Sequence, residues 1–219
     1  MADLRQRIEL RKLAAVLHVD ESELAYLGAS DVEELRALRR LTTEALFQRH
    51  EPRLKLLASA SGILPAAVSA KIAEHALGAT LSARVAGVME PDTAAKLAGG
   101  LSPAFRAELA SDLEPARVAP IMALLPREMV LDVARRLIAA RDMVTLARLV
   151  TVVDAEVAVA LADEIDPAEL LQLVLNVEDE AGLVPLLAKL PAEKRAALLD
   201  AASDEEERAV ALDLLSGPR

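Results

Sequence analysis

The chain has 219 residues and a formal net charge of −10, and 53% of its residues are apolar although it contains only one tyrosine and two phenylalanines. This length suits one elongated domain or two small ones, and the core has to be built from alanine, leucine and valine. The chain contains no cysteine, which excludes a disulfide framework and any metal site with thiolate ligands.

The negative charge is carried by residues 57–219, which contain 15 basic and 25 acidic side chains, whereas residues 1–56 contain ten of each. An acidic surface repels phosphate backbones, so we expect no nucleic-acid partner. The chain does not open with the basic and then apolar segments of a secretory signal, and its longest run without charge, Leu56–Ala70, is too short to span a bilayer. We therefore expect a cytoplasmic protein with no membrane span.

Residues 1–80 are predicted to form an N-terminal helical cap region. Apolar spacing predicts helices over 2–18, from 20 or 22 to 28, and over 31–50, 51–62 and 65–77, with another starting at Thr80 or Ser82. Gly78 is a natural residue to follow a helix C-terminus. The side chains expected to point inward from the first and third helices are Leu4, Ile8, Leu13, Ala14, Leu17, Val32, Leu35, Leu38, Leu41 and Leu46.

The segment 56–83 contains only two charged residues, Lys71 and Glu74. One interpretation is an exposed apolar surface, used for self-association or for contact with a membrane. The other, which we prefer from the sequence, is that these helices are buried where the N-terminal region docks, because the first unit of a helical repeat needs a cap.

From Pro91 onward the chain repeats in units of about twelve residues. The steps between successive starts are 12, 12, 12, 14, 14, 12, 13, 12 and 12 residues, and the starts are Pro91, Pro103, Pro115, Arg127, Arg141, Ala155, Pro167, Glu180, Ala192 and Asp204. The fourth, seventh, eighth and eleventh positions of a unit share one face of a helix, and the seventh is apolar throughout. Proline suits the first turn of a helix, with Ser102 and Asp166 as N-caps.

A helix of this length is marginal in water unless it packs against neighbours. Short helices that repeat in pairs are therefore predicted to form an all-α structure, an α-solenoid in which each unit is stabilised by the adjacent ones. We assign residues 81–219 to this solenoid.

Other motifs were weighed against simpler explanations. A helix–turn–helix over 8–27 would place acidic residues where a recognition helix meets DNA, so two packed capping helices are preferred. The histidines at 18, 50 and 75 are far apart in sequence. Acidic groups at helix junctions could bind Mg²⁺ or Ca²⁺, although solvated helix starts explain them more simply; they are Asp163, Glu164, Asp166, Glu178, Asp179, Glu180 and 204–207.

No catalytic signature is found: the sequence has no G-x-S-x-G, no phosphate-binding glycine loop and no H-E-x-x-H. We therefore predict that the chain is not an enzyme, and we assign no catalytic, cofactor or metal residues.

Several segments of the repeat resemble a known family. Leu-Leu-Pro-Arg-Glu at 124–128, Lys-Leu-Pro-Ala-Glu at 189–193, Asp-Pro-Ala-Glu-Leu-Leu at 166–171 and the segment 137–149 are similar to the cytosolic N-terminal domain of MgtE-type magnesium transporters. The middle domain of the flagellar rotor protein FliG shares that architecture. The resemblance covers residues 81–215 and implies a right-handed α-solenoid.

This chain departs from the transporters because it lacks the regulatory domains and membrane helices that follow in them. Residues 1–80 match nothing in the family, and its magnesium-sensing carboxylates have no assigned counterparts here. We therefore predict a non-catalytic protein–protein interaction, scaffold or regulatory module that binds another protein, with self-association through 56–83 as one form. The alternative is a regulator that responds to Mg²⁺ through the acidic helix junctions.

Overall fold

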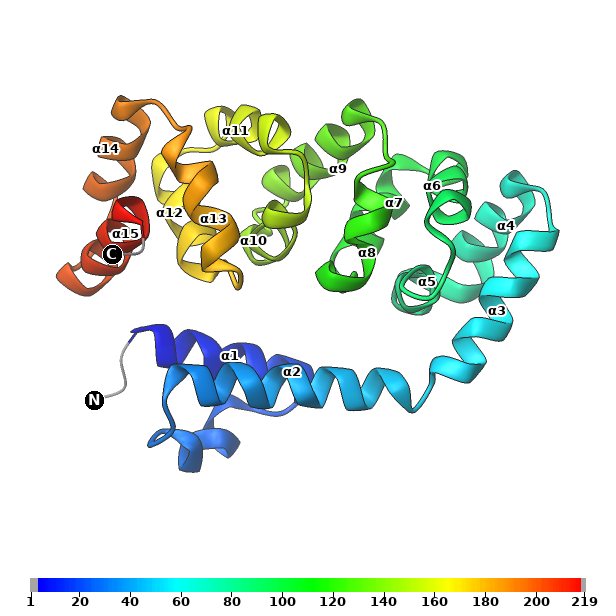
Figure 1. The fold of residues 1–219 in the computed structure, drawn as a ribbon, viewed down its shortest axis with the longest axis horizontal. Coiled ribbons are helices and arrows are strands. Elements are labelled where there is room, and N and C mark those ends of the chain that lie inside the picture. Colours follow the sequence, from blue (N-terminus) through cyan, green and yellow to red (C-terminus); the bar gives the residue numbers. More distant parts are fainter. Residues whose placement is uncertain (1–3, 218–219) are drawn as a thin grey trace. The chain divides into compact units, whose positions relative to one another are not determined.

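The computed structural model describes residues 4–217, and every regular element in this range is a helix (Figure 1). The chain divides into two compact units, Met1–Pro52 (unit 1) and Arg53–Arg219 (unit 2). This division precedes the helices between residues 53 and 80, whereas the sequence analysis placed a boundary between residues 80 and 81.

Unit 1 consists of α1 (Leu4–Leu17), the 3₁₀ helix η1 (Glu21–Leu27) and α2 (Val32–Gln48). Asp20 and Asp31 each accept a hydrogen bond from a backbone amide of the helix that follows, in two capping boxes. Gln6 Nε2 donates to the carbonyl oxygens of Gly28 and Ser30 and so ties the turn before α2 to α1. The core is small; it comprises Leu10, Leu13, Ala14, Leu24 and Leu35, with Val19 and Leu27 against it.

The inward faces predicted for unit 1 are only partly correct. Leu13, Ala14 and Leu35 are buried, but four of the predicted core leucines are exposed; these are Leu17, Leu38, Leu41 and Leu46. For Leu41 and Leu46 the reason is geometric, since α2 continues past the end of α1 (Figure 1) and its C-terminal half has no helix of unit 1 to cover it.

Unit 2 contains the remaining helices. Its first part comprises α3 (Glu51–Ile63, which starts at the end of unit 1), α4 (Ala66–Ile72), the π-helix η2 (Ala73–Leu77), α5 (Gly78–Ala86), α6 (Pro91–Gly100), α7 (Pro103–Ala110) and α8 (Pro115–Met122). The second part comprises α9 (Arg127–Ala139), α10 (Met143–Leu149), the 3₁₀ helix η3 (Val150–Val152), α11 (Ala155–Glu164), α12 (Pro167–Asn176), α13 (Glu180–Ala188), α14 (Ala192–Asp200) and α15 (Glu205–Ser216).

The repeat predicted from the sequence is visible in the positions of these helices. Eight of the predicted starts coincide with the first residue of a helix; they are Pro91, Pro103, Pro115, Arg127, Ala155, Pro167, Glu180 and Ala192. The last helix begins one residue after Asp204, whose side chain is the N-cap and accepts a hydrogen bond from Glu207 N.

The start predicted at Arg141 is wrong. Arg141 has a φ of 56° and so lies in the left-handed region that ends α9. Asp142 follows as the N-cap of α10, and it accepts hydrogen bonds from Thr145 N at 3.0 Å and from Thr145 Oγ1 at 2.7 Å. The longer step from Arg127 therefore contains a longer helix, since α9 has 13 residues, and a turn after which α10 begins with its own cap.

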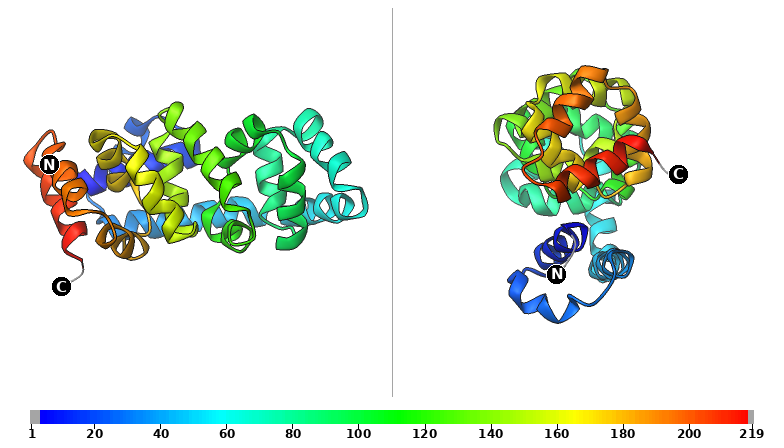
Figure 2. Two further views of the ribbon diagram at one scale, coloured as in Figure 1. Left: turned by 90° about the horizontal axis from the view of Figure 1, so that it is seen from above. Right: turned by 90° about the vertical axis from the view of Figure 1, so that its left-hand side faces the viewer.

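The helices of unit 2 pack in a regular order. From α4 to α7 each helix contacts the second α-helix after it, and the same holds from α9 to α13. Along the length of the unit the helices follow one another, and seen end-on they form a ring (Figure 2). The side chains at the seventh positions of the predicted repeat are buried or half-buried in every case, so this face of each helix points inward as predicted.

No helix between residues 4 and 217 combines the length and the apolar character that a membrane crossing requires.

Candidate functional site

Four of the acidic residues considered for a cation site form helix caps or an ion pair. Asp166, Asp179 and Asp204 are N-caps whose carboxylates accept hydrogen bonds from backbone amides of α12, α13 and α15. Glu164 forms a two-pronged pair with Arg135 of α9, with the closest N···O distance at 2.8 Å. Within the described residues no group of three or more His, Asp or Glu side chains is placed to hold a metal ion.

The pKa values of these carboxylates reflect the same contacts. The hydrogen bond from Arg135 holds the pKa of Glu164 below its ordinary value, and Glu164 in turn raises the pKa of Arg135. Hydrogen bonds from the amides of Glu169 and Ala168 lower the pKa of Asp166. Lowered carboxylate pKa values at N-caps are expected because the backbone donors stabilise the charged form.

The segment considered as a helix–turn–helix does not have two α-helices, because η1 is a 3₁₀ helix. The three histidines are exposed, and each lies on a different element or turn. Neither feature assembles a binding site.

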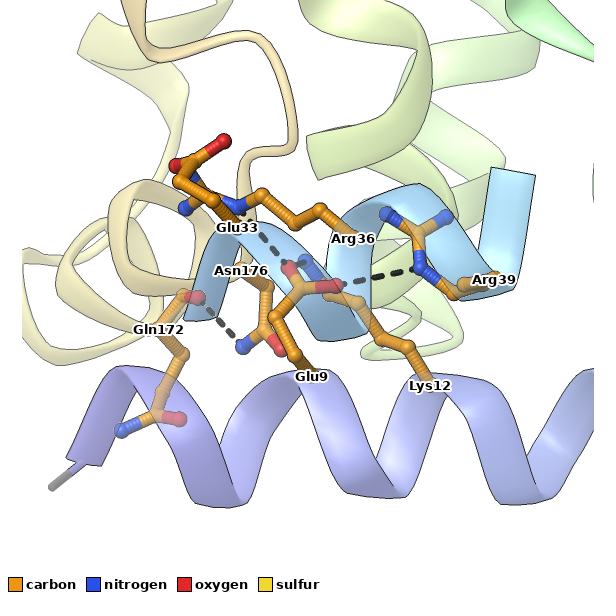
Figure 3. Close-up of polar contacts among 7 residues, drawn as sticks. All are labelled: Glu9, Lys12, Glu33, Arg36, Arg39, Gln172 and Asn176. Atoms are coloured by element: carbon orange, nitrogen blue, oxygen red, sulfur yellow. Dashed lines mark hydrogen bonds and ion pairs between the residues drawn. The ribbon is translucent and has the colours of Figure 1, made fainter. Parts of the chain in front are cut away.

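Unit 1 contains a buried charged cluster that the sequence analysis did not identify. Glu9 of α1 is 1% exposed, and its carboxylate lies between Lys12 of the same helix and two arginines of α2 (Figure 3). Its distances are 3.1 Å to Arg39 Nε, 3.4 Å to Lys12 Nζ and 3.5 Å to Arg36 Nε. Arg36 also meets the exposed carboxylate of Glu33 at 2.9 Å. The cluster joins α1 to α2, and the cations satisfy a carboxylate that burial would otherwise make costly.

Unit 2 exposes a group of apolar side chains on α3, α4 and the turn between them. Leu56 and Ile63 share one face of α3, Val68 and Ile72 share one face of α4, and Leu64 lies in the turn. Their exposed fractions range from 40% for Ile72 to 85% for Ile63. We call these five residues the α3–α4 patch.

The exposed side chains of the patch differ from the burial that we expected for this segment, and docking of the N-terminal region stays a prediction. Among the described side chains of the segment 56–83 those that are buried are small, including Ser69, Ala70 and Ala73, whereas the five large side chains of the patch are exposed. Ser69 Oγ donates to the carbonyl oxygen of Ser61 at 3.0 Å and so holds α4 against α3. An apolar surface of this kind on a folded unit is typical of an interaction site.

The second feature of unit 2 is a partly open apolar cavity of about 180 Å³ (the central cavity). Its lining runs from Ser61 of α3 to Leu190 after α13 and consists almost wholly of alanine, valine, leucine, isoleucine and methionine. A packed protein interior seldom contains spaces larger than a water molecule, so an apolar space of this size is a candidate ligand site.

One charged side chain lies among the described residues that line the central cavity. Arg106 of α7 lies 3.8 Å from Asp132 through Nη2 and 3.4 Å from the carbonyl oxygen of Ala98 through Nη1. Its Nε atom is buried and has no hydrogen-bond partner. Since a guanidinium presents its donors as a rigid fork, a buried unpaired Nε is a position where an acceptor would be stabilised.

Searches for matching family models, for curated relatives and for similar solved structures found no match to this chain. The resemblance to the MgtE-type domain therefore stays a prediction.

The patch could have been found from the sequence, because the near absence of charge between residues 56 and 83 is its signal. The central cavity had no such signal. Its lining residues are the same inward alanines, leucines and valines that fill an ordinary core, and only the ring of helices leaves space between them.

Proposed function

We propose that the chain is a non-catalytic protein–protein interaction module built on an α-solenoid, and that the α3–α4 patch is its contact surface. The observation that carries the proposal is the exposure of five large apolar side chains on adjoining elements. Burying such side chains against a partner removes apolar area from water, which is the main driving force of protein association.

The solenoid itself is part of the proposal. It is supported by short helices, of 7 to 13 residues from α6 to α15, that recur at nearly constant steps, and by contacts of most of these helices with the second helix after them. The right-handed sense is implied by the resemblance to the MgtE-type domain.

The first partner to test is a second copy of the chain. The patch is apolar and lies in a segment with only two charged residues, so a matching partner surface should also be apolar. A second copy of the chain offers such a surface, namely the same patch. Self-association would place the two patches against each other as an isologous contact, with the remainder of each solenoid free.

Sedimentation velocity over a range of concentrations tests the proposal. The native chain is expected to show an average mass that rises with concentration, and Ile63→Asp with Val68→Asp should abolish the rise because charges would be introduced into the contact. Leu212→Asp is the matched control, since Leu212 is also an exposed leucine (53%) but lies on α15. A native chain that stays monomeric throughout, or a rise that survives in the double variant, would contradict self-association through the patch.

The cation-responsive alternative stays a prediction; four of its acidic residues, Glu164, Asp166, Asp179 and Asp204, form an ion pair or cap a helix.

A further inference from the structure

We infer that the central cavity of unit 2 binds one long-chain fatty acid, with its alkyl chain along the cavity and its carboxylate at Arg106. The inference is independent of the α3–α4 patch and of self-association.

The shape of the cavity favours a single alkyl chain. Its lining is drawn from helices that follow one another from α3 to α13, and its volume is about 180 Å³. The space is therefore small relative to the number of helices along which it extends, and a flexible chain of methylene groups can follow such a narrow apolar path.

The lining favours an apolar ligand with one polar end. Apart from Arg106, its polar side chains are serine hydroxyls, and these are Ser61, Ser69 and Ser82. Ser69 and Ser82 already donate to carbonyl oxygens within the unit. A ligand that needs many hydrogen bonds would lose its contacts with water and gain few in return.

Arg106 determines the charge of that polar end. Its Nε has no partner and its two other contacts are long, so a carboxylate could accept hydrogen bonds from Nε and a neighbouring Nη together. An alcohol would accept fewer hydrogen bonds there, and a cationic head group would be repelled.

A dansyl-labelled undecanoic acid is a direct probe, because its fluorescence rises when it leaves water. With the full-length native chain we expect saturable binding that palmitate displaces and that hexadecanol displaces more weakly. Arg106→Gln should weaken the binding of palmitate by about tenfold or more and leave the binding of hexadecanol unchanged, because only the carboxylate is attracted by the guanidinium charge. Arg127→Gln is the matched control; Arg127 lies outside the cavity and pairs with Glu156 at 3.3 Å.

Variants that fill the cavity test the binding of the alkyl chain independently of the binding of the head group. Val133→Phe and Val159→Phe place larger side chains at two half-buried lining positions, and each should weaken palmitate and hexadecanol alike. Circular dichroism establishes that each variant is folded; if neither phenylalanine variant folds, Val133→Leu and Val159→Leu take their place with the same expectation.

Several results would overturn the inference. They are the absence of saturable probe binding by the folded native chain, undiminished binding by every folded cavity variant, or equal loss of palmitate and hexadecanol in Arg106→Gln. Displacement of the probe by an amphipathic helical peptide but not by palmitate would assign the cavity to a protein segment and would also overturn it.

Discussion

Glu9 has three cations around its carboxylate and almost no contact with water. Its role is to hold two helices together in a unit whose apolar core is small. Removing the charge of Glu9 takes away the buried carboxylate that Lys12, Arg36 and Arg39 share, and breaking a buried ion pair in this way is strongly destabilising.

We therefore expect Glu9→Gln to lower the free energy of unfolding of unit 1 by about 3 kcal/mol. Glu33→Gln is the matched control, because Glu33 contacts the same Arg36 but its side chain is 79% exposed, and its loss should cost less than about 1 kcal/mol. Urea unfolding of the chain, monitored through hydrogen exchange at the amides of α1 and α2, measures the effects of both substitutions. Equal effects of the two substitutions would contradict the structural role of Glu9.

The Arg135–Glu164 pair predicts a pH dependence. Because Arg135 lowers the folded-state pKa of Glu164, the pair contributes stability above the unfolded pKa of a glutamate, and this contribution is lost as the pH falls through the folded pKa. An NMR titration should give Glu164 a midpoint below that of an ordinary glutamate, and Arg135→Gln should raise the midpoint. A midpoint that Arg135→Gln leaves unchanged would show that the pair does not form.

At the residue scale, the sequence predicted burial well where helical periodicity determines it and poorly where it depends on residues far away in the chain. Leu13 and Leu35 were correctly placed in the core. Glu9 was treated only as a charge in the first helix, since its burial depends on two arginines thirty and twenty-seven residues later in the chain. Helical periodicity contains no information about such a contact.

At the scale of the elements, proline and aspartate determine where the helices of unit 2 begin. Pro91, Pro103, Pro115 and Pro167 each open a helix, as their fixed φ and missing amide predict. The error at Arg141 arose because a left-handed residue followed by an aspartate cap looks like part of the repeat when only spacing is counted.

Two adjacent glycines at the end of α6 can be used to test how closely α4 approaches this helix. A Cβ at Gly99 would meet nothing within 4 Å, whereas a Cβ at Gly100 would lie 3.1 Å from Ala70 Cβ of α4. Gly99→Ala should stabilise the chain by up to about 1 kcal/mol through helix propensity and reduced unfolded-state entropy.

Gly100→Ala should gain less than Gly99→Ala, or be destabilising, because α4 and α6 have to separate slightly. Thermal unfolding of the two variants gives the comparison. A larger gain at Gly100 than at Gly99 would mean that the two helices do not approach as closely as described.

At the scale of the whole molecule, unit 2 is organised by contacts between helices that are near in sequence but not consecutive. Polar pairs bridge the same neighbours, since Arg127 and Arg135 of α9 reach Glu156 and Glu164 of α11. The sequence predicted an all-helical repeat from its period, and the all-α class is confirmed. The central cavity depends on how the helices close into a ring, which no local pattern encodes.

The proposed function depends on the exposed apolar side chains of the α3–α4 patch at the start of unit 2. A repeat structure leaves an apolar face at each end unless something covers it. From the sequence we assigned α3 and α4 to the helical cap of the repeat, and these two helices themselves carry large exposed apolar side chains.

The most direct test uses the absence of cysteine from the chain. A single cysteine introduced at Lys71, an exposed residue of α4 beside the patch, can be joined between copies by a flexible bis-maleimide, with Lys189→Cys after α13 as the control. The proposal predicts covalent dimers from Lys71→Cys, few from Lys189→Cys, and their loss when Ile63→Asp is added. Equal cross-linking at the two positions, or dimers that persist with Ile63→Asp, would contradict self-association through the α3–α4 patch.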